Sequence, residues 1–144
     1  MVNRYYSNQG EDVEVKVGDN QNLPYKDDYF EYIISINAIH YESNEEGINS
    51  ALTETNRVLK PGGRFIVFTV GPEHLIYKRA KSLGNHKYEI DDFDFRDGQQ
   101  LFYFDNLKYL EFYLQHHFKD IELGRVTENL MERPLDFLIA VCTK

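Results

Sequence analysis

The side chains that could do chemistry follow three predicted strands, at the points where those strands end. These segments are residues 18–20, 36–41 and 69–74. Ligands of open α/β sheets bind at the carboxyl ends of the strands. His40 could accept a proton from a hydroxyl or amine nucleophile, because an imidazole of ordinary pKa, about 6.5, is largely neutral at pH 7. The alternative for His40 is a hydrogen-bonded structural residue. His74, which follows the next strand, is expected to open onto the same edge of the sheet.

Composition limits the partners and cofactors of the chain. The five histidines show no metal-ligand spacing with one another or with the single cysteine, Cys142, so no metal site is expected. A lone cysteine excludes an internal disulfide framework and fits a reducing, cytoplasmic compartment. No apolar run approaches the roughly 20 residues that span a bilayer, so no membrane partner is expected. The net charge is −8 with dispersed Lys and Arg residues, which argues against a nucleic acid as main partner.

The elements that must position these residues include a helix-to-strand corner. Residues 44–59 carry apolar side chains at helical spacing, and Pro61 cannot continue that helix. Gly62 and Gly63 allow the positive backbone angles that often follow a helix. The apolar run at residues 65–68 then predicts a strand buried on both faces, as in a parallel sheet between helices. This corner is the closing half of a βαβ unit and indicates an α/β fold.

Two stretches together resemble a known family. Residues 18–35, GDNQNLPYKDDYFEYIIS, place an acidic loop before a strand, and residues 57–69, RVLKPGGRFIVFT, form the corner. In order and spacing they resemble the class I S-adenosylmethionine-dependent methyltransferases. The resemblance implies S-adenosylmethionine as cofactor and an α/β, partial Rossmann-like sheet, mostly parallel with a C-terminal antiparallel strand pair. Residues 121–127 and 135–141 are the expected pair.

Part of the family's sheet has no counterpart in this sequence. The resemblance implies the strand order 3-2-1-4-5-7-6, with residues 13–17 as strand 3 and residues 31–36 as strand 4. The Gly-rich first motif is absent, and a βαβ unit takes about 30 residues, whereas twelve precede Val13. The chain is therefore interpreted as a single domain, residues 1–144, that lacks the N-terminal strands. An unpaired strand 4 predicts rearrangement, a homodimer or a partner that supplies the missing half, and the alternative is a truncated sequence.

The resemblance also implies cofactor-binding residues. Asp19 corresponds to the acidic residue that contacts the adenine amino group, and the amide of Asn20 would lie near the ring. Ile36 and Asn37 end the central strand, where the family contacts the methionine part of the cofactor. A carboxylate can accept a hydrogen bond from an exocyclic amine. The alternative for Asp19 is a turn cap within Gly-Asp-Asn.

The substrate is expected on the same side of the sheet. His40 is the predicted catalytic base or orienting residue, and Tyr41 and His74 are the predicted substrate-binding residues. Residues 71–85 begin with Pro near the first helical position and end with Gly-Asn, which predicts a helix. Residues 88–104 contain an Asp-Gly hairpin signal and predict an antiparallel hairpin, either a lid over the substrate or a hairpin packed on the core.

Two functions from different classes remain open. The first is an S-adenosylmethionine-dependent methyltransferase acting on a small molecule, incomplete as this chain. The second is a non-catalytic methyltransferase-like remnant that self-associates through an exposed sheet edge. Because the Gly-rich motif is absent, the sequence does not decide between an enzyme and a remnant.

Overall fold

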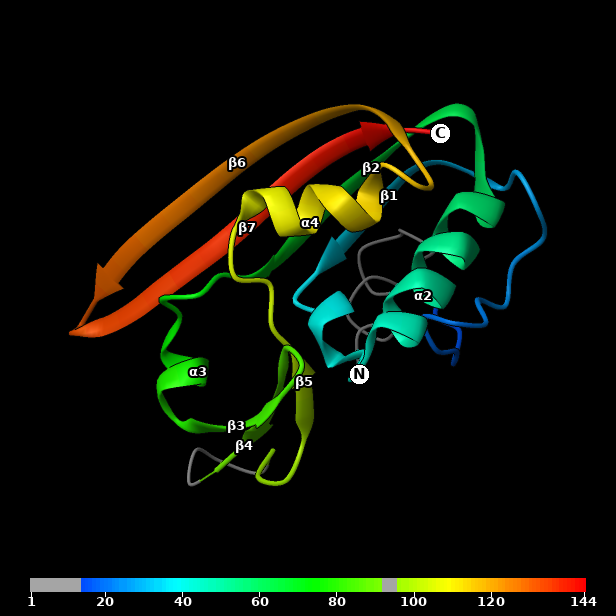
Figure 1. Cartoon of the computed structure of the whole chain (residues 1–144). Helices are drawn as coiled ribbons and strands as arrows, with labels where there is room; N and C mark the ends of the chain where they lie inside the picture. The colour runs from blue at the N-terminus through cyan, green and yellow to red at the C-terminus, as the bar shows by residue number, and fades with distance from the viewer. Residues whose placement is uncertain (1–13, 92–95) are drawn as a thin grey trace, which may run out of the picture.

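A computed structural model describes residues 14–91 and 96–144, which contain both strands and helices (Figure 1). The strands are β1 (Phe30–Ile36), β2 (Leu59–Val70), β3 (Ala80–Gly84), β4 (Lys87–Ile90), β5 (Gln100–Phe102), β6 (Lys119–Leu130) and β7 (Arg133–Thr143). The helices are the short 3-10 helix η1 (Ile39–Tyr41), α2 (Glu45–Val58), α3 (Leu75–Lys78) and α4 (Leu107–Leu114).

The larger sheet has four strands in the order β1-β2-β7-β6. β1 and β2 are parallel, whereas β7 is antiparallel to both β2 and β6. The predicted α/β class with a C-terminal antiparallel pair is confirmed, and the order matches the 4-5-7-6 part of the expected sheet. Parallel pairing is confined to β1 and β2 among the described residues.

Local signals account for the corner between α2 and β2. The side chain of Asn44 accepts a hydrogen bond from Gly47 N at 2.8 Å, so it caps α2. Gly62 has a φ of 76°, which a residue with a side chain rarely adopts. A Cβ on Gly63 would lie 2.8 Å from the carbonyl oxygen of Lys60. Glycine is therefore required twice where the chain turns from α2 into β2.

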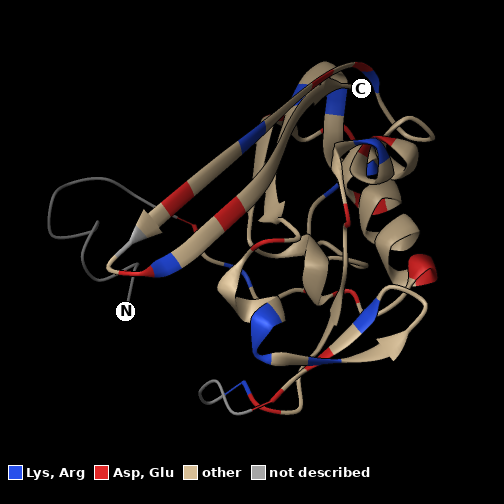
Figure 2. Cartoon of the chain, turned by 60° about the vertical axis from the view of Figure 1, so that its left-hand side comes forward, with Lys and Arg blue, Asp and Glu red and all other residues tan. Residues whose placement is uncertain are grey.

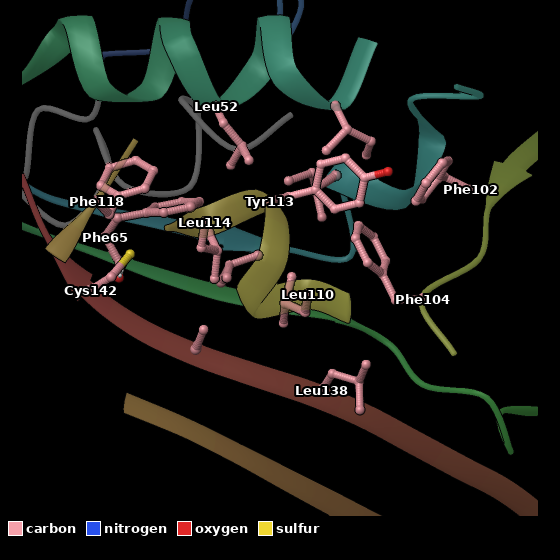
Figure 3. Close-up of a cluster of buried hydrophobic side chains, with 14 of the residues drawn as sticks. Leu52, Phe65, Phe102, Phe104, Leu110, Tyr113, Leu114, Phe118, Leu138 and Cys142 are labelled. Carbon is pink, nitrogen blue, oxygen red and sulfur yellow. Dashed lines mark hydrogen bonds between the residues drawn. The ribbon is translucent and has the colours of Figure 1, made fainter. Parts of the chain in front are cut away.

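Helices cover one face of the larger sheet. Phe65 and Val67 of β2 are buried, whereas the alternate residues Ile66 and Phe68 are half-exposed. Leucines of α2, α4 and β7 point into the same cluster as Phe65 (Figure 3). The prediction of a strand buried on both faces is therefore wrong for the second face, because α2 and α4 both pack against the first.

A second, three-stranded sheet, β3-β4-β5, follows α3. The predicted helix at residues 71–85 is wrong in its second half, since Ala80–Gly84 pairs with β4 as a strand. The predicted hairpin is confirmed as the antiparallel pair β4 and β5, and residues 92–95 of that segment lie outside the described residues. Tyr77 of α3 donates a hydrogen bond from its hydroxyl to Phe102 O at 2.9 Å and joins α3 to this sheet.

The strand predicted at residues 13–17 is not present in its described part, residues 14–17. Val15 is 57% exposed and Val17 is 99% exposed, so neither packs on a sheet. A strand needs a hydrogen-bonded neighbour, and the strands expected beside this segment have no counterpart in the sequence. The alternation of apolar and polar residues was therefore not enough to predict a strand here. Val13 lies outside the described residues.

Candidate functional site

Three loop segments lie beyond the carboxyl ends of β1 and β2. The side-chain amide of Asn20 donates a hydrogen bond to Glu42 Oε1 at 3.0 Å, and that of Gln21 donates to Glu42 Oε2 at 2.7 Å. These contacts join the turn before β1 to the segment after it. Asn37 N donates to Phe68 O at 2.9 Å, which ties the end of β1 to β2. The first two of the predicted ligand segments are thus brought together.

The predicted cofactor residues divide into two groups. Asn20 and Ile36 line one pocket of about 320 Å³ beside the end of β1. Asp19 is exposed, and its Oδ1 accepts a hydrogen bond from Gln21 N at 2.8 Å. This is the geometry of the turn-cap alternative, so the adenine contact of Asp19 stays a prediction. Asn37 has a φ of 51°, and its exposed side chain does not line this pocket.

His40 is buried behind the strand ends. The residue is 1% exposed, and its Nδ1 lies 3.2 Å from Thr69 Oγ1. Burial lowers the pKa of His40 to about 3, and the nearby positive charges of His74 and Arg96 add to this effect. The imidazole is therefore neutral around pH 7. This geometry is that of the hydrogen-bonded structural alternative, and a role as base stays a prediction.

The predicted substrate residues line a more polar region. Tyr41 and Arg96 line a pocket of about 490 Å³, and Arg96 Nη1 donates to the Tyr41 hydroxyl at 3.2 Å. His74 Nδ1 accepts a hydrogen bond from Ile76 N at 3.1 Å, so the proton of its neutral ring lies on Nε2. Burial lowers the pKa of His74. Sequence reasoning missed Arg96, whose only signal is a cation within an acidic stretch before Asp97.

A buried ion pair supports the turn after β2. Asp136 of β7 is 1% exposed, and its carboxylate oxygens accept from Arg125 Nε at 2.7 Å and Nη2 at 2.9 Å. Asp136 Oδ2 also accepts from Glu73 N at 2.8 Å. A Cβ on Gly71 would lie 2.5 Å from the same oxygen. Sequence reasoning missed this network, although a lone carboxylate within the apolar run of β7 was the available signal.

Residues 14–91 and 96–144 were also compared with what a metal site, a membrane-spanning helix and a reactive thiol require. Within these ranges no three His, Cys, Asp or Glu side chains gather to hold a metal ion. The same part of the chain has no helix of the length and apolar character that crossing a membrane needs. Cys142 is buried, and burial raises the pKa of its thiol to about 12, which disfavours the reactive thiolate.

Comparison with known proteins bears on these loops and strands directly. Residues 1–67 match the family model described as a methyltransferase domain. This match supports the resemblance to the class I methyltransferases. It is 47% identical over 79 residues to "Probable tRNA methyltransferase 9B" of Mus musculus, a match that covers 55% of this chain and 16% of the mouse protein. The chain thus spans about one sixth of that curated relative.

Solved structures share the fold of this chain over nearly its whole length. A protein of Pyrococcus horikoshii OT3 superposes with a TM-score of 0.67 at 22% identity, over 98% of this chain and 64% of that protein. A Thermotoga maritima structure is described as a SAM-dependent methyltransferase, possible histamine N-methyltransferase. It superposes with a TM-score of 0.66 at 22% identity, over 94% of this chain and 66% of that one. The resemblance inferred from two sequence stretches is confirmed, and these likenesses show the fold.

Proposed function

We propose that this chain functions in S-adenosylmethionine-dependent methyl transfer to a small molecule. The observation that carries the proposal is the pocket in which Asn20, from the loop before β1, and Ile36, the last residue of β1, lie together. The position fits the general rule that open α/β sheets bind ligands at strand carboxyl ends. The Thermotoga neighbour is described as SAM-dependent, which supports the same cofactor.

The residues present fit such a cofactor. The bond from Gln21 N uses Oδ1 of Asp19, so Oδ2 is the oxygen for the adenine amine. The amide of Asn20 would lie beside the ring, while Ile36 and Asn37 would contact the methionine part. When bound, S-adenosylmethionine supplies a methyl group on a positively charged sulfur. The residues of the chain bind and orient both reactants and exclude water.

The second pocket suits a small acceptor. Tyr41 and Arg96 offer a hydroxyl and a guanidinium, and His74 would face the same edge of the sheet. Lys and Arg residues are spread over several elements of the described chain (Figure 2), with one small group at Lys78, Arg79 and Lys81. The net charge of −8 disfavours an RNA backbone as partner. The mouse relative is named as a tRNA enzyme, but this chain spans 16% of it. RNA is therefore the alternative substrate class. A cytoplasmic location remains part of the proposal.

Calorimetric titration with S-adenosylhomocysteine tests the proposal. We expect the folded chain to bind it, and Asp19→Ala to weaken binding about tenfold, equivalent to ~1.4 kcal/mol. The control is Glu128→Ala, which removes an exposed carboxylate from β6. Unchanged affinity in Asp19→Ala would show that the adenine role is wrong. No binding by a chain with native circular dichroism would remove the enzyme interpretation for this chain.

The second candidate is a non-catalytic remnant that self-associates through β1. The exposed side chains of Tyr32 and Ile34 on this edge strand favour it. A folded chain that has the mass of a dimer and binds no S-adenosylhomocysteine would support this candidate over the first.

A further inference from the structure

Glu42 holds two side chains of the turn before β1. Its Oε1 accepts a hydrogen bond from Asn20 Nδ2 at 3.0 Å, and its Oε2 accepts from Gln21 Nε2 at 2.7 Å. The backbone N–H of Glu42 donates to Ile39 O at 3.1 Å, which fixes the residue to η1. Asn20 lines the pocket beside the end of β1 and Glu42 does not, so Glu42 can act on a ligand there only through Asn20.

The chemistry of this contact decides which way the Asn20 amide is turned. A carboxylate only accepts hydrogen bonds, whereas a side-chain amide has a nitrogen that donates and an oxygen that accepts. The nitrogen of Asn20 must therefore face Glu42. The oxygen, Oδ1, accepts no hydrogen bond from the residues that the structure describes. Held in this way, Asn20 offers an acceptor to a ligand.

The first turn of α2 leaves room for this arrangement. A Cβ on Gly47 would lie 3.0 Å from Glu42 Oε2 and 3.3 Å from Gln21 Nε2, which is closer than side chains normally pack. Glycine inside a helix is destabilising relative to alanine, and Gly47 has no positive φ that would require it. The close approach of the Glu42 carboxylate explains this glycine. The positive end of the helix dipole also favours a negative charge there.

The turn that carries Asn20 is closed by its own contacts. Asn22 N donates to Asp19 O at 3.2 Å, and Gln21 N donates to Asp19 Oδ1 at 2.8 Å. The shape of the turn therefore does not need Glu42, whereas the direction of the Asn20 amide does. Removal of the Glu42 carboxylate should free the side chain of Asn20 and leave the backbone of the turn in place.

We propose that Glu42 is a positioning residue that makes Asn20 selective for a purine with an amino group. The inference rests on the proposed function, in which S-adenosylmethionine binds beside Asn20. The exocyclic amine of adenine has two N–H donors, and Asp19 Oδ2 and Asn20 Oδ1 can accept one each. A purine with an oxo group in place of the amine would face two acceptors with a third. A site whose polar groups are left unpaired in this way rejects the wrong ligand.

A purely structural role for Glu42 predicts a different result. If Glu42 only held the turn against α2, its loss would weaken the amino and the oxo ligand by the same factor. If Glu42 orients Asn20, its loss frees the amide, which can then turn its Nδ2 toward an oxo group. The ratio of the two affinities therefore separates the two roles.

Calorimetric titration with S-adenosylhomocysteine and with its oxo analogue, S-inosylhomocysteine, measures this ratio. We expect the wild type to prefer S-adenosylhomocysteine about a hundredfold, because two acceptors lose their partner at roughly tenfold each. Glu42→Ala should reduce the preference to about tenfold, and Asn20→Ala should reduce it equally. The double variant should show the same preference as either single variant, because Glu42 acts through Asn20.

The matched control is Gln21→Ala, which removes the other partner of Glu42 and leaves the Asn20 contact in place. Its preference should equal that of the wild type. Glu42→Gln should also keep most of the preference, because the exposed Gln21 amide can turn to face the new nitrogen while the oxygen still accepts from Asn20. Circular dichroism checks that each variant folds. If Glu42→Ala does not fold, Asn20→Ala still tests whether Asn20 reads the amine.

Three results would overturn the proposal. The first is a wild type that binds the two ligands equally, and the second is a folded Glu42→Ala that keeps the wild-type ratio. The third is an Asn20→Ala variant that keeps this ratio. In all three cases S-adenosylhomocysteine still binds, so the proposed function stands. A folded wild type that binds neither ligand would instead remove the proposed function and this inference with it.

Discussion

Replacing Asp136 by alanine removes the acceptor on which the turn after β2 depends. The carboxylate is 1% exposed and receives two hydrogen bonds from Arg125 and one from Glu73 N. Breaking a buried pair costs about 3–5 kcal/mol. The Arg125 side chain is 39% exposed, so water can solvate it after the change and the cost should be lower. We therefore expect a loss of about 2–3 kcal/mol in unfolding free energy.

Urea unfolding followed by circular dichroism measures this loss. For a chain of this size ~1 kcal/mol corresponds to roughly 2–4 °C in Tm, so Asp136→Ala should melt about 5–10 °C lower. The m-value should stay the same, since the unfolded state exposes a similar surface. The Tm of Asp136→Asn should lie between those of the wild type and Asp136→Ala, because the amide oxygen of Asn can still accept a hydrogen bond from Glu73 N.

The matched control is Glu122→Ala, which removes the partner of Arg64 on the sheet surface. Arg64 Nη2 and Glu122 Oε1 are 3.3 Å apart, and the two side chains are 43% and 77% exposed. An exposed pair contributes about 0–1 kcal/mol. If Asp136→Ala lowers the unfolding free energy no more than Glu122→Ala does, then burial does not make the Asp136–Arg125 pair more stabilising than the exposed Glu122–Arg64 pair, and the reasoning is refuted.

Two further predictions concern the same strand ends. Gly71→Ala should cost about 1–3 kcal/mol in urea unfolding, because its Cβ would lie 2.5 Å from Asp136 Oδ2; an unchanged midpoint would mean that the turn moves freely. Burial lowers the pKa of His40 to about 3, so between pH 6.5 and 3 the unfolded state binds more protons. Stability should therefore fall as pH drops through this window, by up to ~1.4 kcal/mol per unit from this residue. The pH slope of wild type minus that of His40→Asn measures the effect, and equal slopes would contradict it.

Sequence reasoning succeeded where the signals were local. The helical spacing of α2, the glycines after it and the apolar run of β2 are all signals within a few residues of the element that they define. It failed at residues 80–84, where Gly84-Asn85 resembles a helix end. Those residues form β3 because β4 pairs with them, and this pairing adds stability that a single-segment pattern does not contain.

The candidate site shows the same division. Strand order placed the segments after β1 and β2 at one edge, and the Asn20 and Ile36 pocket agrees with that expectation. The burial of His40 could not be read from its neighbours, because it depends on packing by distant residues. The hydrogen bond from Glu73 N to Asp136 joins residues that are 63 positions apart in the sequence. No spacing rule links residues that far apart.

The strand-end loops are fixed by contacts between segments that are far apart in the sequence. The side-chain amide of Asn20 donates a hydrogen bond to Glu42. His40 Nδ1 is within hydrogen-bond distance of Thr69 Oγ1, and Glu73 N donates to the carboxylate of Asp136. Each of these contacts joins residues within the described chain. It follows that Asp136→Ala should speed amide hydrogen exchange in the turn at residues 71–74 and leave exchange in the Asn20 turn unchanged, because the two turns are held by separate contacts.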